Sequence, residues 1–111
     1  SDDNGFTWSK MSQPVPDTGR GGNPPMLIRL ADGRLCLTYG VRRPPYGMRA
    51  KISENGGASW NPEIVLTDDC GSHDLGYPRT VQRADGSVVT IYYTTDRLGG
   101  EGYLAATIWR P

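Results

Sequence analysis

The chain has 111 residues, with 12 basic and 12 acidic side chains and a formal net charge of zero. That balance indicates neither a nucleic-acid partner nor an anionic membrane surface. Its 15 Gly and 9 Pro are too many helix-breaking residues for long helices, and no segment keeps a 3.6-residue apolar period or is apolar enough to span a bilayer. We therefore expect an all-β fold with almost no helix.

Turn signals divide the chain into short strands. Ala31-Asp32-Gly33 and Ala84-Asp85-Gly86 each stand between two runs rich in β-branched and apolar residues, a pattern typical of hairpins. Taken in chain order, strands are predicted at residues 6–11, 26–30, 34–41, 49–53, 60–66, 77–83, 88–94 and 103–109.

The chain repeats itself. Residues 25–33 superpose on residues 78–86 with a constant offset of 53, which also matches Tyr39 with Tyr92. An eight-residue turn pattern occurs twice, the second copy starting 52 residues after the first. A polar residue that bonds its own backbone, then a Gly at positive φ, closes each turn, and this spacing predicts a repeat protein. The two copies are Ser1-x-Asp3-x-Gly5-x-Thr7-Trp8 and Ser53-x-Asn55-x-Gly57-x-Ser59-Trp60.

The turn pattern resembles the Asp-box, or bacterial neuraminidase repeat, of sialidase-like β-propellers. The resemblance implies antiparallel four-stranded blades of a six-bladed propeller, with strands A to D counted outward from the axis. The predicted strands then read D, A-B-C-D, A-B-C, about two blades in one partial or oligomer-completed propeller domain spanning residues 1–111. Residues 1–66 hold a D strand and one full blade, and residues 67–111 hold strands A to C of the next.

In this family the boxes lie opposite the active site, so the box residues are expected to be structural. The other rim gathers residues 12–24, 42–48, 67–76 and 95–102, and function is expected there. A bulky polar residue that only one repeat carries is not needed for the packing that both repeats share, so it is a candidate for function. Tyr77 stands at the position that Pro24 holds in the other repeat, and Arg49 matches Leu104 if one loop is two residues longer. Asp74, with His73 beside it, lies in the loop just before Tyr77.

The resemblance implies roles for these residues. Arg49 would be one of the arginines that grip a sialic acid carboxylate, through two parallel charge-assisted bonds. Tyr77 would be the nucleophile, since a neutral phenol suits a negatively charged sugar, and it would need a nearby base. Asp74 and Glu101, with Asp96, are the acids on this rim. The implied function is a sialidase-type glycoside hydrolase acting at the axial cleft; the alternative is a non-catalytic carbohydrate-binding or assembly module.

Structural roles stay open for the same residues. Tyr77 could pack on Pro78, and Arg49 could pair with Glu54 or Asp74. His73 is a candidate substrate contact, but no second His or Cys spacing supports a metal site, and no cofactor is expected. The remaining candidates, either solvated charges or anion binders, are Arg42, Arg43 and Arg79.

Two blades cannot close a ring, and the strand after Trp8 and the strand ending near Trp109 would each present an unpaired edge. We expect a carbohydrate ligand, acidic in the sialidase case, no nucleic-acid or membrane partner, and a homotrimer in which three chains form one six-bladed propeller. The alternative is that the chain is part of a longer single-chain propeller. Either arrangement should place Arg49 and Tyr77 on one rim, within reach of one ligand.

Overall fold

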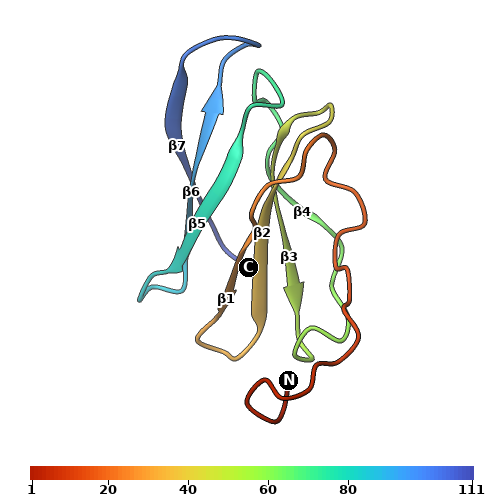
Figure 1. The fold of residues 1–111 in the computed structure, drawn as a ribbon. Coiled ribbons are helices and arrows are strands. Elements are labelled where there is room, and N and C mark those ends of the chain that lie inside the picture. Colours follow the sequence, from red (N-terminus) through yellow and green to blue (C-terminus); the bar gives the residue numbers. More distant parts are fainter.

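Seven strands form two antiparallel sheets in the computed structural model, which describes residues 1–111 (Figure 1). The first sheet has the order β1-β2-β3-β4, with β1 (Met26–Arg29), β2 (Leu35–Val41), β3 (Gly47–Ser53) and β4 (Ile64–Thr67). The second has the order β5-β6-β7, with β5 (Gly76–Gln82), β6 (Val88–Thr95) and β7 (Gly102–Trp109). The all-β prediction is confirmed, and no helix capable of crossing a membrane is present.

The register of the strands confirms the internal repeat. Met26 lies opposite Thr38 in the first sheet, and Arg79 lies opposite Ile91 in the second, so both members of the pair shift by 53 residues. Each hairpin turn closes through a glycine at positive φ, where an L side chain would be strained: Gly33 has φ 91° and Gly86 has φ 81°. The two Asp-Gly turns therefore close hairpins, as the sequence predicted.

The strand predicted at residues 6–11 is wrong. These residues join no ladder, and Phe6, Trp8 and Met11 are exposed, because no other strand of the chain lies beside them. The strand predicted at residues 60–66 is shorter than expected, since β4 begins only at Ile64. Pro62, which has no N–H to give to a ladder, delays its start.

The two sheets pack face to face. Leu30, Cys36 and Ile52 from the first sheet and its turn form one buried cluster with Val88 of β6. A hydrogen bond of 2.7 Å joins the buried hydroxyls of Thr38 and Thr80 across the same interface. Burial raises the pKa of the Cys36 thiol to about 11, so this cysteine is an unreactive core residue.

Loops of the two sheets separate into two ends. Residues 42–46, 68–75 and 96–101 lie at one end, which we call the loop rim, together with residues 18–23, which contact Gly40 and Arg42. The boxes and the Asp-Gly turns lie at the other end (Figure 1). Loops and boxes thus gather at opposite ends of the two sheets.

The two boxes have the same internal hydrogen bonds. In each, the glycine N–H donates to the Oγ of the first serine, at 2.7 Å in the first box and 2.8 Å in the second. A second N–H donates to Oδ1 of Asp3 at 2.9 Å and of Asn55 at 2.8 Å. The side-chain oxygen of Asn can accept this hydrogen bond just as a carboxylate oxygen does, so the replacement of Asp by Asn keeps the turn. The bonds support a structural role for the boxes.

Candidate functional site

Tyr77 is held in an unusual backbone conformation at the loop rim. It is the second residue of β5, has φ +51°, and follows Gly76 at φ +132°. The ladder between β5 and β6 is irregular from Gly76 to Arg79, so Tyr77 lies in a β-bulge. Its side chain is 51% exposed and makes no hydrogen bond within the chain. A bulky residue at positive φ is strained and persists only where its surroundings enforce it, which makes Tyr77 a candidate for function.

Tyr93 of β6 connects Tyr77 to Asp74. The two tyrosine rings have their centroids 5.8 Å apart at an interplanar angle of 44°. The Tyr93 hydroxyl donates a hydrogen bond of 2.8 Å to Oδ1 of Asp74. Partial burial and this hydrogen bond raise the pKa of Tyr93 above its ordinary value. The N–H of Asp74 donates to Oγ of Ser72 at 3.0 Å, which fixes the loop that carries the carboxylate.

Arg42 holds three segments of the loop rim together. Its Nε and one terminal nitrogen donate to the carbonyl of Leu75 at 3.0 and 2.9 Å, and its other terminal nitrogen donates to the carbonyl of Gly22 at 3.0 Å. It also donates to the Tyr93 hydroxyl at 3.2 Å. Four of the five guanidinium N–H groups are thus used within the chain. Arg42 therefore positions the loops around Tyr93 and is not free to bind a carboxylate through two bonds.

The residues in this contact network differ from their counterparts in the first sheet. At the 53-residue offset, Tyr93 corresponds to Gly40, Tyr77 to Pro24 and Thr95 to Arg42. A Cβ at Gly40 would lie 2.8 Å from Leu75, so the first sheet has no room for a side chain there. The packing that the two repeats share therefore does not require these side chains. We call Arg42, Asp74, Tyr77 and Tyr93 the rim cluster.

Arg49 is buried against its own sheet. Its side chain is on β3, opposite Tyr39, and the residue is only 4% exposed. Nε lies 3.3 Å from Oε1 of Glu63, and the terminal nitrogens donate to the carbonyls of Met48, Thr67 and Pro45. The structural ion pair is therefore with Glu63, and the two partners considered from the sequence, Glu54 and Asp74, were wrong.

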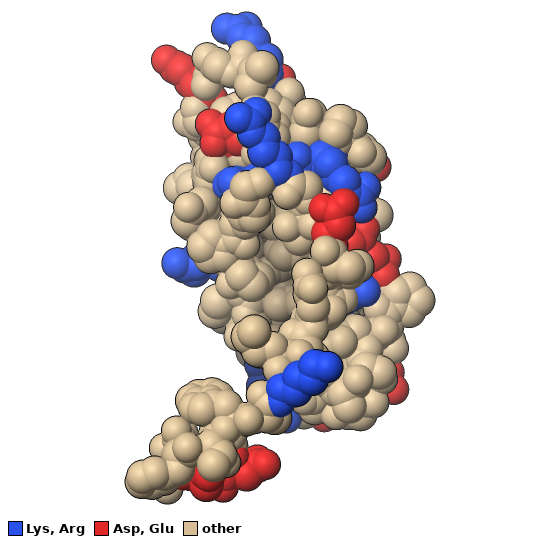
Figure 2. Space-filling model, turned by 45° about the vertical axis from the view of Figure 1, so that its right-hand side comes forward, with Lys and Arg blue, Asp and Glu red and all other residues tan.

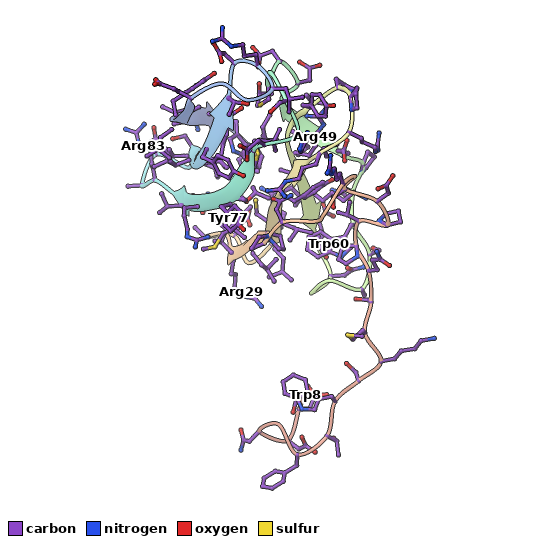
Figure 3. The ribbon with its side chains drawn as sticks, turned by 45° about the horizontal axis from the view of Figure 1, so that its top comes forward. Trp8, Arg29, Arg49, Trp60, Tyr77 and Arg83 are labelled. Carbon is purple, nitrogen blue, oxygen red and sulfur yellow. The ribbon has the colours of Figure 1, made fainter.

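Arg49 and Tyr77 lie near the starts of β3 and β5. Both strands start at the same end of the molecule, but they belong to different sheets (Figure 3). Neighbours of Arg49 along β3, Met48 and Ala50, are buried on the side that meets the second sheet. Arg49 alternates with them and points to the opposite side. Both residues therefore lie toward the loop rim, but the structure shows no contact that joins Arg49 to the rim cluster, and the buried Arg49, paired with Glu63, is not placed within reach of a ligand at Tyr77.

The strand register corrects the match between Arg49 and Leu104. Tyr39 lies opposite Arg49, and its counterpart Tyr92 lies opposite Ala105. Arg49 therefore corresponds to Ala105, and the loop before β7 is three residues longer than its counterpart rather than two. Because Ala105 cannot form an ion pair, the repeated sheet still does not require an arginine at this position.

Glu101 and Asp96 lie apart from the rim cluster. With Arg97, Gly102 and Tyr103 they line an open hollow of about 400 Å³ formed by the β6–β7 loop. None of the rim-cluster residues lines this hollow. The structure thus brings Asp74 to Tyr77 through Tyr93, but it does not bring Glu101 there.

The other predicted site residues, Arg43, Arg79 and His73, make no hydrogen bond or ion pair with the rim cluster. Nε of Arg43 lies 3.4 Å from Oδ2 of Asp17, and both side chains are largely exposed. Arg79 is exposed on β5 and donates to the carbonyl of Pro78 at 3.0 Å. The His73 side chain is half-buried, and no three His, Cys, Asp or Glu side chains gather to hold a metal ion. Basic side chains around the loop rim are interspersed with acidic ones (Figure 2).

No family model and no curated protein matches the chain. Among solved structures, it is similar to a protein of unknown function from Dyadobacter fermentans DSM 18053, with a TM-score of 0.70 and 40% sequence identity. The match covers 84% of this chain and 26% of that chain. The chain therefore spans about a quarter of the protein that it matches, and the shared feature is this arrangement of two sheets.

Proposed function

We propose that the rim cluster is the carbohydrate site of a sialidase-like β-propeller and that its activity is glycoside hydrolysis, with Tyr77 as the nucleophile. The observation that carries the proposal is the strained, half-exposed Tyr77 with an unbonded hydroxyl, in ring contact with Tyr93. Strain of this kind gathers at ligand and catalytic sites. Two tyrosine rings offer apolar faces to a sugar ring, and a carboxylate offers an acceptor for its hydroxyls.

The proposed propeller has six four-stranded blades, of which this chain supplies about two. The strand order, the constant offset and the two boxes on the end opposite the rim cluster support this architecture. The Dyadobacter fermentans protein accommodates a segment of this kind in a chain about four times as long as the matched part, which leaves room for the remaining blades.

The chemistry assigns one step to Tyr77. Its phenol oxygen would bond to the anomeric carbon as the glycosidic bond breaks, while the phenol proton passes to a carboxylate and the leaving oxygen takes a proton from an acid. Asp74 is the carboxylate of the cluster. For an acidic sugar, the available guanidinium is that of Arg79, because it is exposed and lies two residues beyond Tyr77 on β5.

A non-catalytic carbohydrate-binding module is the second candidate, and one observation favours it. The Arg42 guanidinium donates four hydrogen bonds within the chain, and that of Arg49 donates three and forms an ion pair with Glu63, so neither offers two free parallel donors to a carboxylate. The cluster also contains a single carboxylate, Asp74. Sugar binding needs neither a guanidinium pair nor a second acid, whereas sialidase-type hydrolysis uses both.

Fluorogenic sialosides and neutral glycosides test the two candidates. We expect turnover that Tyr77→Phe abolishes and Tyr103→Phe leaves unchanged, since Tyr103 is an exposed tyrosine outside the cluster. Sugar binding without turnover, lost in Tyr77→Ala and kept in Tyr103→Ala, would establish the binding module instead. If no sugar is bound or cleaved, or if Tyr77 and Tyr103 variants behave alike, the proposed site is wrong.

A further inference from the structure

The side chain of Asn23 lies between the two sheets at the loop rim. Its Nδ2 donates a hydrogen bond of 3.2 Å to the carbonyl of Gly40 on β2. Its Oδ1 is buried and accepts no hydrogen bond. Turning the amide over would place this oxygen against the Gly40 carbonyl, so the bond to Gly40 fixes which way the amide faces. A buried acceptor without a partner costs folding free energy, and its position therefore calls for an explanation.

The amide of Asn23 also lies against Gly76, the residue before Tyr77. A Cβ at Gly76 would lie 2.5 Å from Oδ1 and 2.9 Å from Cγ of Asn23, both too close for a real carbon atom. A Cβ at Gly40 would lie 2.9 Å from the same oxygen. The amide therefore fills the space that a side chain at either glycine would need, and it joins the first sheet to the start of β5.

The repeat shows that this amide is not part of the packing that both sheets share. At the 53-residue offset, the counterpart of Asn23 is Gly76 itself, so only the first repeat carries an amide at this position. The two repeats thus touch through equivalent positions, one with a side chain and one without. A side chain at both positions would not fit, because Asn23 already fills the space beside Gly76.

Arg42 holds together the two segments that meet at this contact. Its guanidinium donates to the carbonyls of Gly22 and Leu75, the residues just before Asn23 and Gly76. The hydrogen bonds of Arg42 keep the segments side by side, and the amide of Asn23 sets how closely they approach. The backbone at Gly76 is therefore fixed from the side of the first sheet.

We propose that Asn23 is a positioning residue for Tyr77. Its amide, tied to the carbonyl of Gly40, holds Gly76 in place. Gly76 and Tyr77 thereby keep φ +132° and +51°, and the Tyr77 ring stays against Tyr93. A strained backbone of this kind persists only where its surroundings enforce it. The inference rests on the proposed function, in which Tyr77 acts on the sugar; Asn23 itself acts through Gly76 and touches no ligand.

Proton NMR of Asn23→Ala tests the proposal. A positive φ brings the N–H and Hα protons of a residue closer together than a negative φ does, so the wild type should give a strong nuclear Overhauser effect between these two protons of Tyr77. It should also give effects between the rings of Tyr77 and Tyr93. Asn23→Ala should lose the ring effects and weaken the effect within Tyr77.

Gln82→Ala is the matched control. The Gln82 amide also joins the two sheets, because it accepts a hydrogen bond of 2.7 Å from the N–H of Ala31 and donates one of 3.3 Å to the carbonyl of Gly86. It does so at the end opposite the loop rim, so its loss should leave the Tyr77 signals intact. The proposal is overturned if Asn23→Ala keeps these signals or if both variants lose them alike.

The wild type alone decides the matter if Asn23→Ala does not fold. The side-chain protons of Asn23 should then show nuclear Overhauser effects to the α protons of Gly76, and their absence overturns the proposal.

Sugar binding is a separate readout. Asn23→Ala must restore the strained backbone when it binds, which should weaken sugar affinity about tenfold, whereas Gln82→Ala should keep the wild-type affinity. Equal affinities of the two variants overturn the proposal. The NMR signals of Tyr77 need no ligand, so failure of the proposed sugar site and failure of the role of Asn23 are distinguishable.

Discussion

The hydroxyl of Tyr93 donates a hydrogen bond of 2.8 Å to Oδ1 of Asp74 and thereby fastens β6 to the loop that precedes β5. The same ring lies against Tyr77. Because Gly40 takes the place of Tyr93 in the first sheet, this link is not part of the framework that the two sheets share. It distinguishes the loop rim of the second sheet from that of the first.

Replacing Tyr77 tests whether its backbone is strained. Tyr77→Gly should unfold at a higher urea concentration than Tyr77→Ala, because both lose the ring but only Gly relieves the positive φ. The left-handed conformation costs an L residue roughly 1–2 kcal/mol, and Gly loses about 0.5–1 kcal/mol through its greater unfolded-state entropy. The expected advantage of Gly is therefore about 1 kcal/mol in the free energy of unfolding. An Ala variant as stable as the Gly variant would show that Tyr77 is unstrained.

Substitution of Arg42 tests its role in holding the loops. Arg42→Lys loses the paired bonds to Leu75 and should lower the free energy of unfolding by about 2 kcal/mol, the value for two or three lost hydrogen bonds. Arg43→Lys is the matched control, since its exposed ion pair with Asp17 should change stability by less than about 0.5 kcal/mol. Denaturation curves measure both changes. Equal effects at the two positions would mean that Arg42 is an ordinary surface residue.

Alkaline pH should weaken the fold through Tyr39. Burial, followed by the hydrogen bond of 2.6 Å that its hydroxyl donates to Glu63, raises the pKa of Tyr39 well above its ordinary value of 10.0. The folded state therefore keeps a proton that the unfolded chain releases near pH 10. This contribution to stability is complete below pH 10 and is lost as the pH rises further. Stability measured from pH 8 to 11 should fall more steeply in the wild type than in Tyr39→Phe, and parallel curves would contradict the assignment.

The two boxes should respond differently to acid. Hydrogen bonds from the Thr7 side chain, the Thr7 N–H and Ser1 lower the pKa of Asp3 below 3.8. This stabilisation of the first box is present above pH 3.8 and disappears as the pH falls through the lowered pKa. In amide NMR spectra, the Thr7 signal should therefore shift at the acid end of a titration. The Ser59 signal, whose acceptor is the uncharged Asn55, is the internal control and should not follow it.

The fold could largely be predicted from the sequence because the turns are encoded locally. Asp-Gly turns and the 53-residue offset defined both hairpins, and the register confirms them. Residues 6–11 were predicted wrongly because a strand also needs a partner, and local sequence cannot show that none lies beside Trp8. The length of the β6–β7 loop was misjudged because loop residues carry no repeat pattern.

The candidate site could be predicted only in part. Asp74, in a loop, and Tyr77, at the start of the strand after it, differ recognisably from their repeat counterparts, but Tyr93 lies within a strand, where an aromatic residue looks like ordinary packing. Tyr93 could have been found by comparing the repeats, because at the 53-residue offset its counterpart is Gly40, which has no side chain. The buried environment of Arg49 could not be foreseen, because Glu63 reaches it across the sheet from beyond the second box.

The central claim is that the rim cluster binds a sugar, and protein NMR tests it most directly. On addition of N-acetylneuraminic acid, with galactose as the neutral comparison, we predict saturable amide shifts concentrated at Asp74, Tyr77 and Tyr93 and abolished by Tyr77→Ala. Shifts that instead concentrate around Asp96 and Glu101, or spectra unchanged at millimolar concentrations of both sugars, would contradict the account.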